Sequence, residues 1–483
     1  MGSTAAAFTY LWPEIIVALT GGLILIADLI WPAPAGDGRS RAWLAYLGVA
    51  GLLAAAMATV PDIGVTKTLF GGIIVVDSLS AFFSFLFLGI GALTLLLSVH
   101  AVPKFTRWIA EFYALVVWCT LGHMLLASTG ELFTIFITLQ LTSLPLIVLI
   151  GYAKLDPKSG EAALKYLLLV LVSTAVLIYG MSLVYGSLGT STISEIGAKL
   201  ATSHDIGTVL AIGLVLLLTG FAFKITAAPF HYWVPDTYEG APTPVTAFMS
   251  VGSKFAGFAL ALRIIVEGLK VPLNWHLIFG VMAALSMTVG NLGAIRQTNI
   301  KRMLAYSGIA QAGYLLVGVA ALSSAGVASV LFYAVAYALA NLAAFGVVIT
   351  VANATGSTEI KSYAGLAKRA PLVGLACAIA LLSLGGLPLM AGFMAKFYVF
   401  LSAARSGLVW LVAIGVVNSV ISLYYYLRVI YEVYVREGET ESLFVDRPAA
   451  LAMSLCIAGV LALGVFPDYA LRAANFAASA LFR

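Results

Sequence analysis

Charged residues are scarce in this sequence: only 10% of its 483 residues are Asp, Glu, Lys or Arg, whereas 62% are hydrophobic. Soluble domains carry roughly one quarter charged residues, so this composition excludes a soluble globular domain. Apolar runs of about twenty residues recur from near Ile15 to near Phe466, and each is long enough to cross the hydrocarbon core of a bilayer. We therefore predict an all-α polytopic membrane protein with about 14 transmembrane helices.

Cysteine is also rare, with three residues, Cys119, Cys377 and Cys456, far apart in apolar runs. Such cysteines are typical of small buried hydrophobic side chains. No CxxC, CxxCH or ferredoxin-type spacing is present, so iron–sulfur clusters and covalent haem are not expected. The Gly-rich phosphate-binding motifs are missing too, which argues against a nucleotide site. We expect no cofactor in this chain.

Features that would divide the chain are likewise missing. Loops are short, many of them under fifteen residues, and no linker or low-complexity segment stands out. We therefore expect residues 1–483 to form a single transmembrane domain. The first apolar run has no basic region before it and no small-residue cleavage pattern before the sequence WPAPAGDG, so it is interpreted as a retained helix.

Basic residues are dispersed over short loops, which gives no sign of nucleic-acid binding but predicts an orientation. If helices alternate in direction, fourteen Lys and Arg residues follow odd-numbered helices and six lie on the opposite side. By the positive-inside rule, both termini are then periplasmic. The fourteen are Arg39, Arg41, Lys104, Arg107, Lys154, Lys158, Arg296, Lys301, Arg302, Lys361, Lys368, Arg369, Arg436 and Arg447. The six are Lys67, Lys199, Lys270, Arg405, Arg472 and Arg483.

Four lysines fall inside the apolar runs: Lys165, Lys224, Lys254 and Lys396. A cation near the bilayer centre costs about 2.5–3.5 kcal/mol, whereas a leucine there returns only about 0.3–0.6 kcal/mol. Burial disfavours the charged form of an amine, so such lysines can gain and lose protons. These four residues indicate a path for ions. The alternative is that they snorkel to the interface, most readily Lys165, which lies four residues after Glu161.

Two apolar runs are interrupted in a similar way. In FAFKITAAPFHYW, Pro229 follows the lysine by five residues, and in LLSLGGLPLMAGFMAKFYVF, Gly385, Gly386 and Pro388 precede Lys396. Proline removes an amide donor, so each run is predicted to be a broken helix. They are the seventh and twelfth helices, and this odd offset predicts two five-helix repeats of inverted orientation, as in transporters. The alternative is a pair of unrelated proline kinks.

Other polar residues in the apolar runs are few. Tyr333, Tyr337 and Asn341 recur at a spacing of four and share a helix face, where they either hold water or join helices. His231 follows the first broken helix, and a proton relay at the surface is one hypothesis for it. Acidic residues lie near expected helix ends; they are Glu14, Asp28, Asp77, Glu131 and Glu432.

The runs FKITAAPFHYWVPDTYEGAPTPVTAFMS, IRQTNIKRMLAYSGIAQAGYLLVG, FYAVAYALANLAAF and LSLGGLPLMAGFMAKFYVF closely resemble the subunit N family of the proton-pumping NADH:quinone oxidoreductase. This enzyme is respiratory complex I, and the mitochondrial counterpart of the family is subunit 2. The resemblance covers nearly the whole chain. The run YEGAPTP at residues 238–244 distinguishes this family from the related subunits L and M, and Lys396, in place of a glutamate, argues against M.

The resemblance implies fourteen helices with two inverted five-helix repeats. It also implies proton-transfer roles: Lys224 as a switch, Lys254 as the central relay, Lys396 on the exit side and Lys165 near a subunit contact. In the family, the lysine of the seventh helix pairs with a glutamate of the fifth, whereas Gln140 stands there in LQLTSLPL. Glutamine can donate or accept hydrogen bonds but cannot hold a charge. Either coupling works through hydrogen bonds and water, which we favour because the four lysines are retained, or this channel is impaired.

The resemblance further implies a translocase subunit that couples quinone (ubiquinone) reduction to proton transport in a respiratory chain. Its expected partners are other membrane-arm subunits, including the antiporter-like ones, with flavin and iron–sulfur clusters in partner subunits. A bacterial plasma (inner) membrane is the expected location. One alternative is a subunit of a multi-subunit sodium/proton antiporter, which shares the fold and the lysines. Another is a structural subunit with a silent channel, motivated by Gln140.

Overall fold

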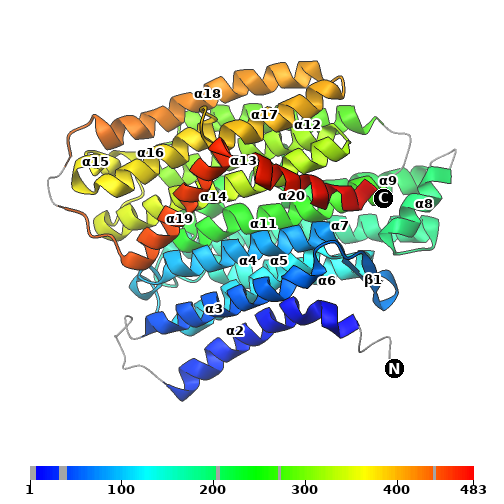
Figure 1. Ribbon diagram of the computed structural model, residues 1–483, viewed down its shortest axis with the longest axis horizontal. Coiled ribbons are helices and arrows are strands. Elements are labelled where there is room, and N and C mark those ends of the chain that lie inside the picture. Colours follow the sequence, from blue (N-terminus) through cyan, green and yellow to red (C-terminus); the bar gives the residue numbers. More distant parts are fainter. Residues whose placement is uncertain (1–6, 32–40, 203–206, 270–273, 439–441, 483) are drawn as a thin grey trace.

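The fold is a bundle of helices that run side by side, as Figure 1 shows for the computed structural model. The structure describes the chain except residues 1–6, 32–40, 203–206, 270–273, 439–441 and 483. In the described ranges, two short strands, β1 (Lys67–Leu69) and β2 (Ile74–Val76), form an antiparallel hairpin in which Lys67 pairs with Val76. The polytopic helical fold is therefore confirmed.

Twelve helices of the described residues are long and apolar enough to cross a membrane, and two shorter apolar helices join them. The total of fourteen crossings and the inverted repeat stay predictions. The twelve include α2 (Trp12–Ile30), α3 (Ala42–Thr59), α4 (Ser78–Ser98), α5 (Ile109–Ala127), α6 (Leu132–Ile150), α7 (Pro157–Leu188), α11 (Thr243–Arg263), α12 (Trp275–Ile295), α13 (Ile300–Ala320), α14 (Ser324–Thr355), α18 (Val409–Tyr434) and α19 (Arg447–Val465). The shorter two are α9 (Thr208–Lys224) and α16 (Pro371–Gly385).

Short helices complete the fold, and one of them, α20 (Asp468–Ala478), was not predicted from the sequence. It follows α19 and packs against α14 and α4. The other short helices are α8 (Ile193–Thr202), α10 (Val234–Gly240), α15 (Leu366–Arg369) and α17 (Ala391–Arg405). Single turns are η1 (Thr9–Leu11), η3 (Val60–Asp62), η4 (Phe70–Gly72), η5 (Val102–Lys104), the π-turn η6 (Ile264–Gly268), η7 (Ile360–Tyr363) and η8 (Ser479–Phe482).

Both predicted helix breaks are confirmed. Helix α9 ends at Lys224, and Thr226 then adopts a φ of 63° before α10 begins. Helix α16 ends at Gly385, followed by Gly386 with a φ of 87°, before α17 begins. A helix end leaves its last carbonyl groups without partners inside the helix. Each break therefore offers backbone acceptors within the bundle.

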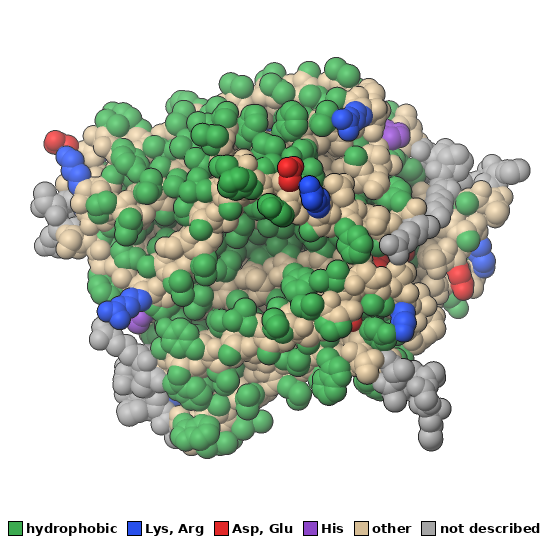
Figure 2. All heavy atoms as spheres, viewed as in Figure 1, with side chains coloured by type: hydrophobic (Ala, Val, Ile, Leu, Met, Phe, Trp, Pro, Cys, Tyr) green, Lys and Arg blue, Asp and Glu red, His purple; other side chains and the backbone are tan. Residues whose placement is uncertain are grey.

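The core of the bundle consists of α11, α13 and α14, which are almost completely enclosed by the other helices. Helices α2, α3, α18 and α19 lie outside and expose apolar side chains. Hydrophobic side chains cover most of the face seen in Figure 2, with few charged groups among them. Such a surface suits lipid contact, and it leaves the enclosed helices as the place for any polar path.

Helix α2 begins and α20 ends at the same end of the bundle, on the right in Figure 1. This arrangement agrees with an even number of crossings. Which end is periplasmic stays a prediction. Three of the basic residues on which that prediction depends, Arg39, Lys270 and Arg483, lie outside the described residues.

Candidate functional site

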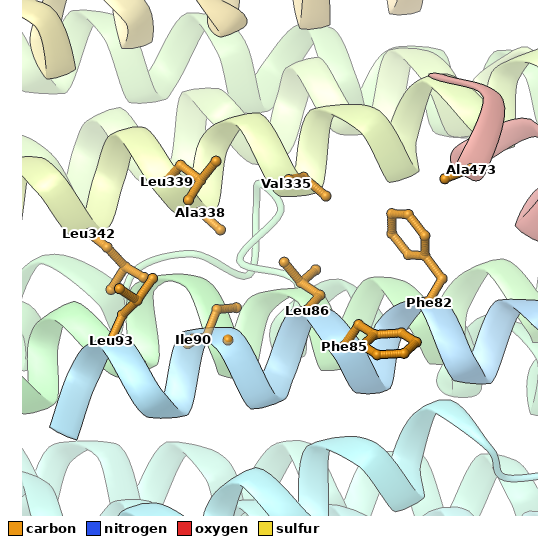
Figure 3. A pocket seen from close by; sticks show the side chains of 11 residues that line it. Phe82, Phe85, Leu86, Ile90, Leu93, Val335, Ala338, Leu339, Leu342 and Ala473 are labelled. Carbon is orange, nitrogen blue, oxygen red and sulfur yellow. The ribbon is translucent and has the colours of Figure 1, made fainter. Parts of the chain in front are cut away.

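A groove between α4 and α14 is the first candidate for a path, but its chemistry excludes ions. Its volume is about 390 Å³, and its lining consists of apolar side chains and one glycine. Figure 3 shows Phe82, Leu86 and Leu93 of α4 facing Val335 and other residues of α14. No side chain there can replace the hydration shell of a proton carrier or cation.

The lysine of the first broken helix, Lys224, is buried at the last position of α9. Its ammonium donates hydrogen bonds to the hydroxyls of Thr142, at 3.2 Å, and Ser143, at 3.3 Å, both on α6. The lysine stem lies against Gly257 of α11, where any side chain would meet its Cγ atom. Gln140 is half-buried on α6 and makes no hydrogen bond to Lys224 in the described structure.

Lys254 lies at the centre of the bundle, on α11, with its side chain almost fully enclosed. Its ammonium donates to the carbonyl of Gly308 on α13 at 2.7 Å and to the hydroxyl of Tyr337 on α14 at 3.4 Å. The nitrogen is also 4.9 Å from the centre of the Tyr337 ring. A ring face attracts a cation, so the tyrosine offers two weak acceptors in place of one anion.

Lys396 lies in the second broken helix, on α17, and reaches back across the break. Its ammonium donates to the carbonyl of Gly385, the last residue of α16, at 2.8 Å. The nitrogen is 4.6 Å from the ring centre of Tyr314 on α13. The break thus supplies the acceptor for the buried lysine that follows it.

Polar side chains of α13 and α14 lie between the contacts of Lys254 and those of Lys396. The hydroxyl of Tyr333, one turn before Tyr337, donates to the side-chain carbonyl of Gln311. The amide of Gln311 in turn donates to the carbonyl of Leu384, at 3.0 Å, directly before Gly385. Two members of the predicted polar stripe therefore lie between the lysines. Gln311 was missed because it stands alone among apolar residues.

The third residue of the predicted stripe has a different role. Asn341 donates to the hydroxyl of Ser250 on α11, one turn before Lys254, at 2.6 Å. This bond joins two enclosed helices beside the central lysine. His231 is half-buried between α9 and α10, and the relay hypothesis for it stays untested.

The three buried lysines share one chemical property: every acceptor that they contact within the described residues is neutral. None of them forms an ion pair there, in contrast to the lysines and arginines at the ends of the bundle. A neutral acceptor stabilises an ammonium much less than a carboxylate does. The arrangement therefore favours lysines that exchange protons over lysines that hold a permanent charge.

The fourth predicted site residue, Lys165, lies apart from these three. Its side chain is half-exposed and forms ion pairs with Glu161 at 2.7 Å and Asp236 at 2.9 Å. Arg302 completes the cluster by pairing with Asp236 and Glu239. Partial burial acts to raise the pKa of Asp236, which lies outside the candidate spans, but hydrogen bonds and charges from Lys165 and Arg302 outweigh it and lower that pKa below 3.8.

A fourth buried lysine, Lys301, was assigned to a loop in the sequence analysis. It lies in the first turn of α13, almost fully buried, and donates to the carbonyl of Ala241 at 2.7 Å. Seven residues separate it from Gly308, so both face the same side of α13, about two turns apart. Lys301 therefore lies between the charged cluster around Asp236 and the acceptor of Lys254. Its burial could not be predicted from the sequence, because Lys301 and Arg302 follow a polar loop directly.

The opposite end of α11 carries a buried ion pair that was also missed. Arg263 is fully buried and pairs with Asp77, the N-cap residue of α4, at 3.0 Å. It also pairs with Glu267 at 3.2 Å and donates to the carbonyl of Ala127 at the end of α5. This pair fixes α11 against α4 and α5 at that end of the bundle.

Comparison with known proteins identifies relatives over nearly the whole chain. A family model described as "NADH:quinone oxidoreductase/Mrp antiporter, TM" matches residues 129–422. NADH-quinone oxidoreductase subunit N of Trichlorobacter lovleyi is 42% identical over 96% of this chain and 95% of its own length. NAD(P)H-quinone oxidoreductase subunit 2 of Gloeothece citriformis is 46% identical over 89% of this chain and 84% of its own.

Solved structures give the same result for the fold. A chain of respiratory complex I from Thermus thermophilus superposes with a TM-score of 0.80 and 33% identity, covering 95% of this chain and 98% of its own. A chain of the Mrp complex from Dietzia superposes with a TM-score of 0.85, covering 97% of both chains. That second chain is only 23% identical, so it supports the fold alone.

Proposed function

The chain belongs to the NADH:quinone oxidoreductase/Mrp antiporter transmembrane family, and we propose that it is a subunit N that translocates protons in an NADH:quinone oxidoreductase. Three buried lysines with neutral acceptors, inside a bundle of apolar helices, support this proposal most directly. The chain is then a subunit of an enzyme, a translocase, but carries no redox centre itself. Its partners are the other membrane-arm subunits, including antiporter-like ones.

The proposed path uses the lysines in the order that the resemblance to subunit N implies. Lys301 and the charged cluster with Lys165 stand at one end of the bundle, where protons are taken up. Lys224 acts as the switch, Lys254 as the central relay, and Lys396 as the residue on the exit side. Tyr337, Tyr333 and Gln311 provide the polar connection between Lys254 and Lys396. Gln140 takes the position of the usual glutamate and cannot store charge.

The remaining parts of the assignment follow from membership of the enzyme. Flavin and iron–sulfur clusters reside in partner subunits, and quinone reduction there supplies the driving force. The chain forms one transmembrane domain over residues 1–483 in a bacterial inner membrane, with both termini on the periplasmic side. The excess of basic residues in loops after odd-numbered helices supports this orientation.

A sodium/proton antiporter subunit is the competing function. It shares the fold, as the Mrp chain illustrates, but at 23% identity that likeness carries no argument about activity. The relatives with 42% and 46% identity are quinone oxidoreductase subunits. The quinone oxidoreductase is therefore favoured.

Purification through a tag on this chain, in mild detergent, tests the assembly. We expect a flavin-containing and iron–sulfur-containing complex with inhibitor-sensitive NADH:quinone reduction. Recovery of hydrophobic subunits alone, with sodium-dependent proton exchange in vesicles, would establish the antiporter instead.

Lys254→Ala tests the path within that complex. We expect the number of protons pumped per NADH oxidised to fall to half of the parent value or less, because the central relay is removed. Lys361→Ala is the matched control, since Lys361 is exposed on η7. Equal pumping by Lys254→Ala and the parent would contradict a proton path through this chain.

A further inference from the structure

A histidine that the sequence analysis overlooked lies beside the Lys224 site. His123, on α5, is completely buried. Its ring packs against Phe87 of α4 and Phe248 of α11, with ring centres 5.3 and 5.4 Å away. Two aromatic rings hold the imidazole in place, so its two nitrogens point in fixed directions.

Cys119 faces one of the two imidazole nitrogens, and its contacts favour one tautomer of the ring. The thiol of Cys119, one turn before His123 on α5, donates to the carbonyl of Thr142 at 3.2 Å. Its sulfur lies 3.8 Å from Nε2 of His123. Because the thiol hydrogen is directed to Thr142, the sulfur accepts from Nε2–H. In the neutral ring, Nδ1 then carries a bare lone pair.

That lone pair is buried without a partner. Nδ1 of His123 is enclosed and makes no hydrogen bond in the described structure. It lies next to Gly252 of α11, where a side chain would come within 3.2 Å of the nitrogen. An unsatisfied acceptor in the interior is costly, and in a proton path it is a place where a proton can bind.

Thr142 and Cys119 connect the imidazole, on its Nε2 side, with the buried lysine. The hydroxyl of Thr142 accepts from the ammonium of Lys224 at 3.2 Å, while its backbone carbonyl accepts from Cys119. Ser143 of α6 also accepts from Lys224, and neither Lys224 nor His123 pairs with a carboxylate in the described chain.

We propose that His123 is the proton-holding partner of Lys224 and takes the place of the carboxylate missing at position 140. The inference rests on the proposed function. One N–H bond of the Lys224 ammonium breaks and leaves a neutral amine, and the proton binds Nδ1 to give an imidazolium; the reverse step restores the lysine. Two like charges in a poorly hydrated site repel each other, so the pair holds one proton at a time.

Two variants remove the titrating group in different ways. His123→Gln keeps a hydrogen-bonding side chain, and His123→Met keeps an apolar side chain of similar volume. His276→Gln is the matched control, because His276 contacts the carbonyl of Ala320 and none of the lysines. Protons pumped per NADH oxidised are measured in membrane vesicles and referred to the amount of assembled complex, so a loss of assembly does not count as a loss of pumping.

In both His123 variants, we expect the drop in protons pumped per NADH to be at least half as large as the drop in Lys224→Ala. The control should pump like the parent. Adding Gln140→Glu to His123→Gln should recover at least half of that loss, which a purely structural histidine would not allow. Suppose that Lys224→Ala is impaired. Parent-like pumping in the His123 variants, or no recovery in the double variant, would then overturn the inference but leave the proposed path in place. Parent-like pumping by Lys224→Ala would overturn the proposed path and the inference together.

Discussion

The ammonium of Lys396 crosses a break in its own transmembrane segment and donates to the carbonyl of Gly385 at 2.8 Å. That carbonyl belongs to the end of α16, where the helix dipole is negative. The buried lysine is therefore held by backbone that a continuous helix would not expose. Its position depends on the conformation of the break, which makes the break itself part of the proposed site.

Gly386→Ala should displace this lysine. Gly386 has a φ of 87°, and an added Cβ would lie 2.9 Å from Cδ of Lys396. We expect lower pumping per NADH and a stability loss of about 1–2 kcal/mol. Gly407→Ala is the control, because Gly407 also has a positive φ, 79°, but nothing within 4 Å of an added Cβ. An equal loss of pumping in both variants would show that backbone strain, and not contact with Lys396, causes the loss.

Tyr333→Phe should interrupt the connection between Lys254 and Lys396. The substitution removes the hydroxyl that donates to Gln311 while keeping the ring in place. We expect pumping per NADH to fall at least twofold with normal assembly. Tyr363→Phe is matched in chemistry and burial, but the Tyr363 hydroxyl has no partner in the described structure. If Tyr333→Phe pumps like Tyr363→Phe, protons do not use this connection.

Arg263→Met should destabilise the protein strongly, because it leaves Asp77 buried and without its partner. Breaking a buried pair from one side costs about 3–5 kcal/mol, whereas replacing both members costs much less. We therefore expect Arg263→Met with Asp77→Asn to recover most of the thermal stability. Arg41→Met provides the comparison, since the Arg41–Asp28 pair is partly exposed. A single variant as stable as the double variant would contradict this account.

Asp236 should stabilise the protein in a pH-dependent way. Its pKa is lowered in the folded state, so its contribution is present above the unfolded value near 3.8 and is lost as the pH falls through the lower folded value. Because the side chain is 40% exposed, we expect only about 0.5–1 kcal/mol. Thermal unfolding of Asp236→Asn and the parent should differ at pH 6 and converge near pH 3. A difference that stays constant with pH would exclude this role.

The sequence by itself determined the fold class, the two helix breaks and the burial of three lysines. These features follow from local chemistry. A run of about twenty apolar residues has to satisfy its own backbone hydrogen bonds, and a proline or a pair of glycines interrupts such a run wherever it stands. A lysine far from either end of such a run therefore lies at depth, as Lys254 and Lys396 do.

The tertiary structure alone decided which groups face those lysines. Asp77 and Arg263 are separated by 186 positions, and the acceptor of Lys254 lies 54 residues away, so neither contact leaves a local pattern. Lys165 lies in an apolar run of the sequence, as the buried lysines do, but it pairs with Glu161 and Asp236 at the surface. Hydropathy reports depth along one helix, whereas contacts depend on how α6, α11, α13 and α17 pack against one another.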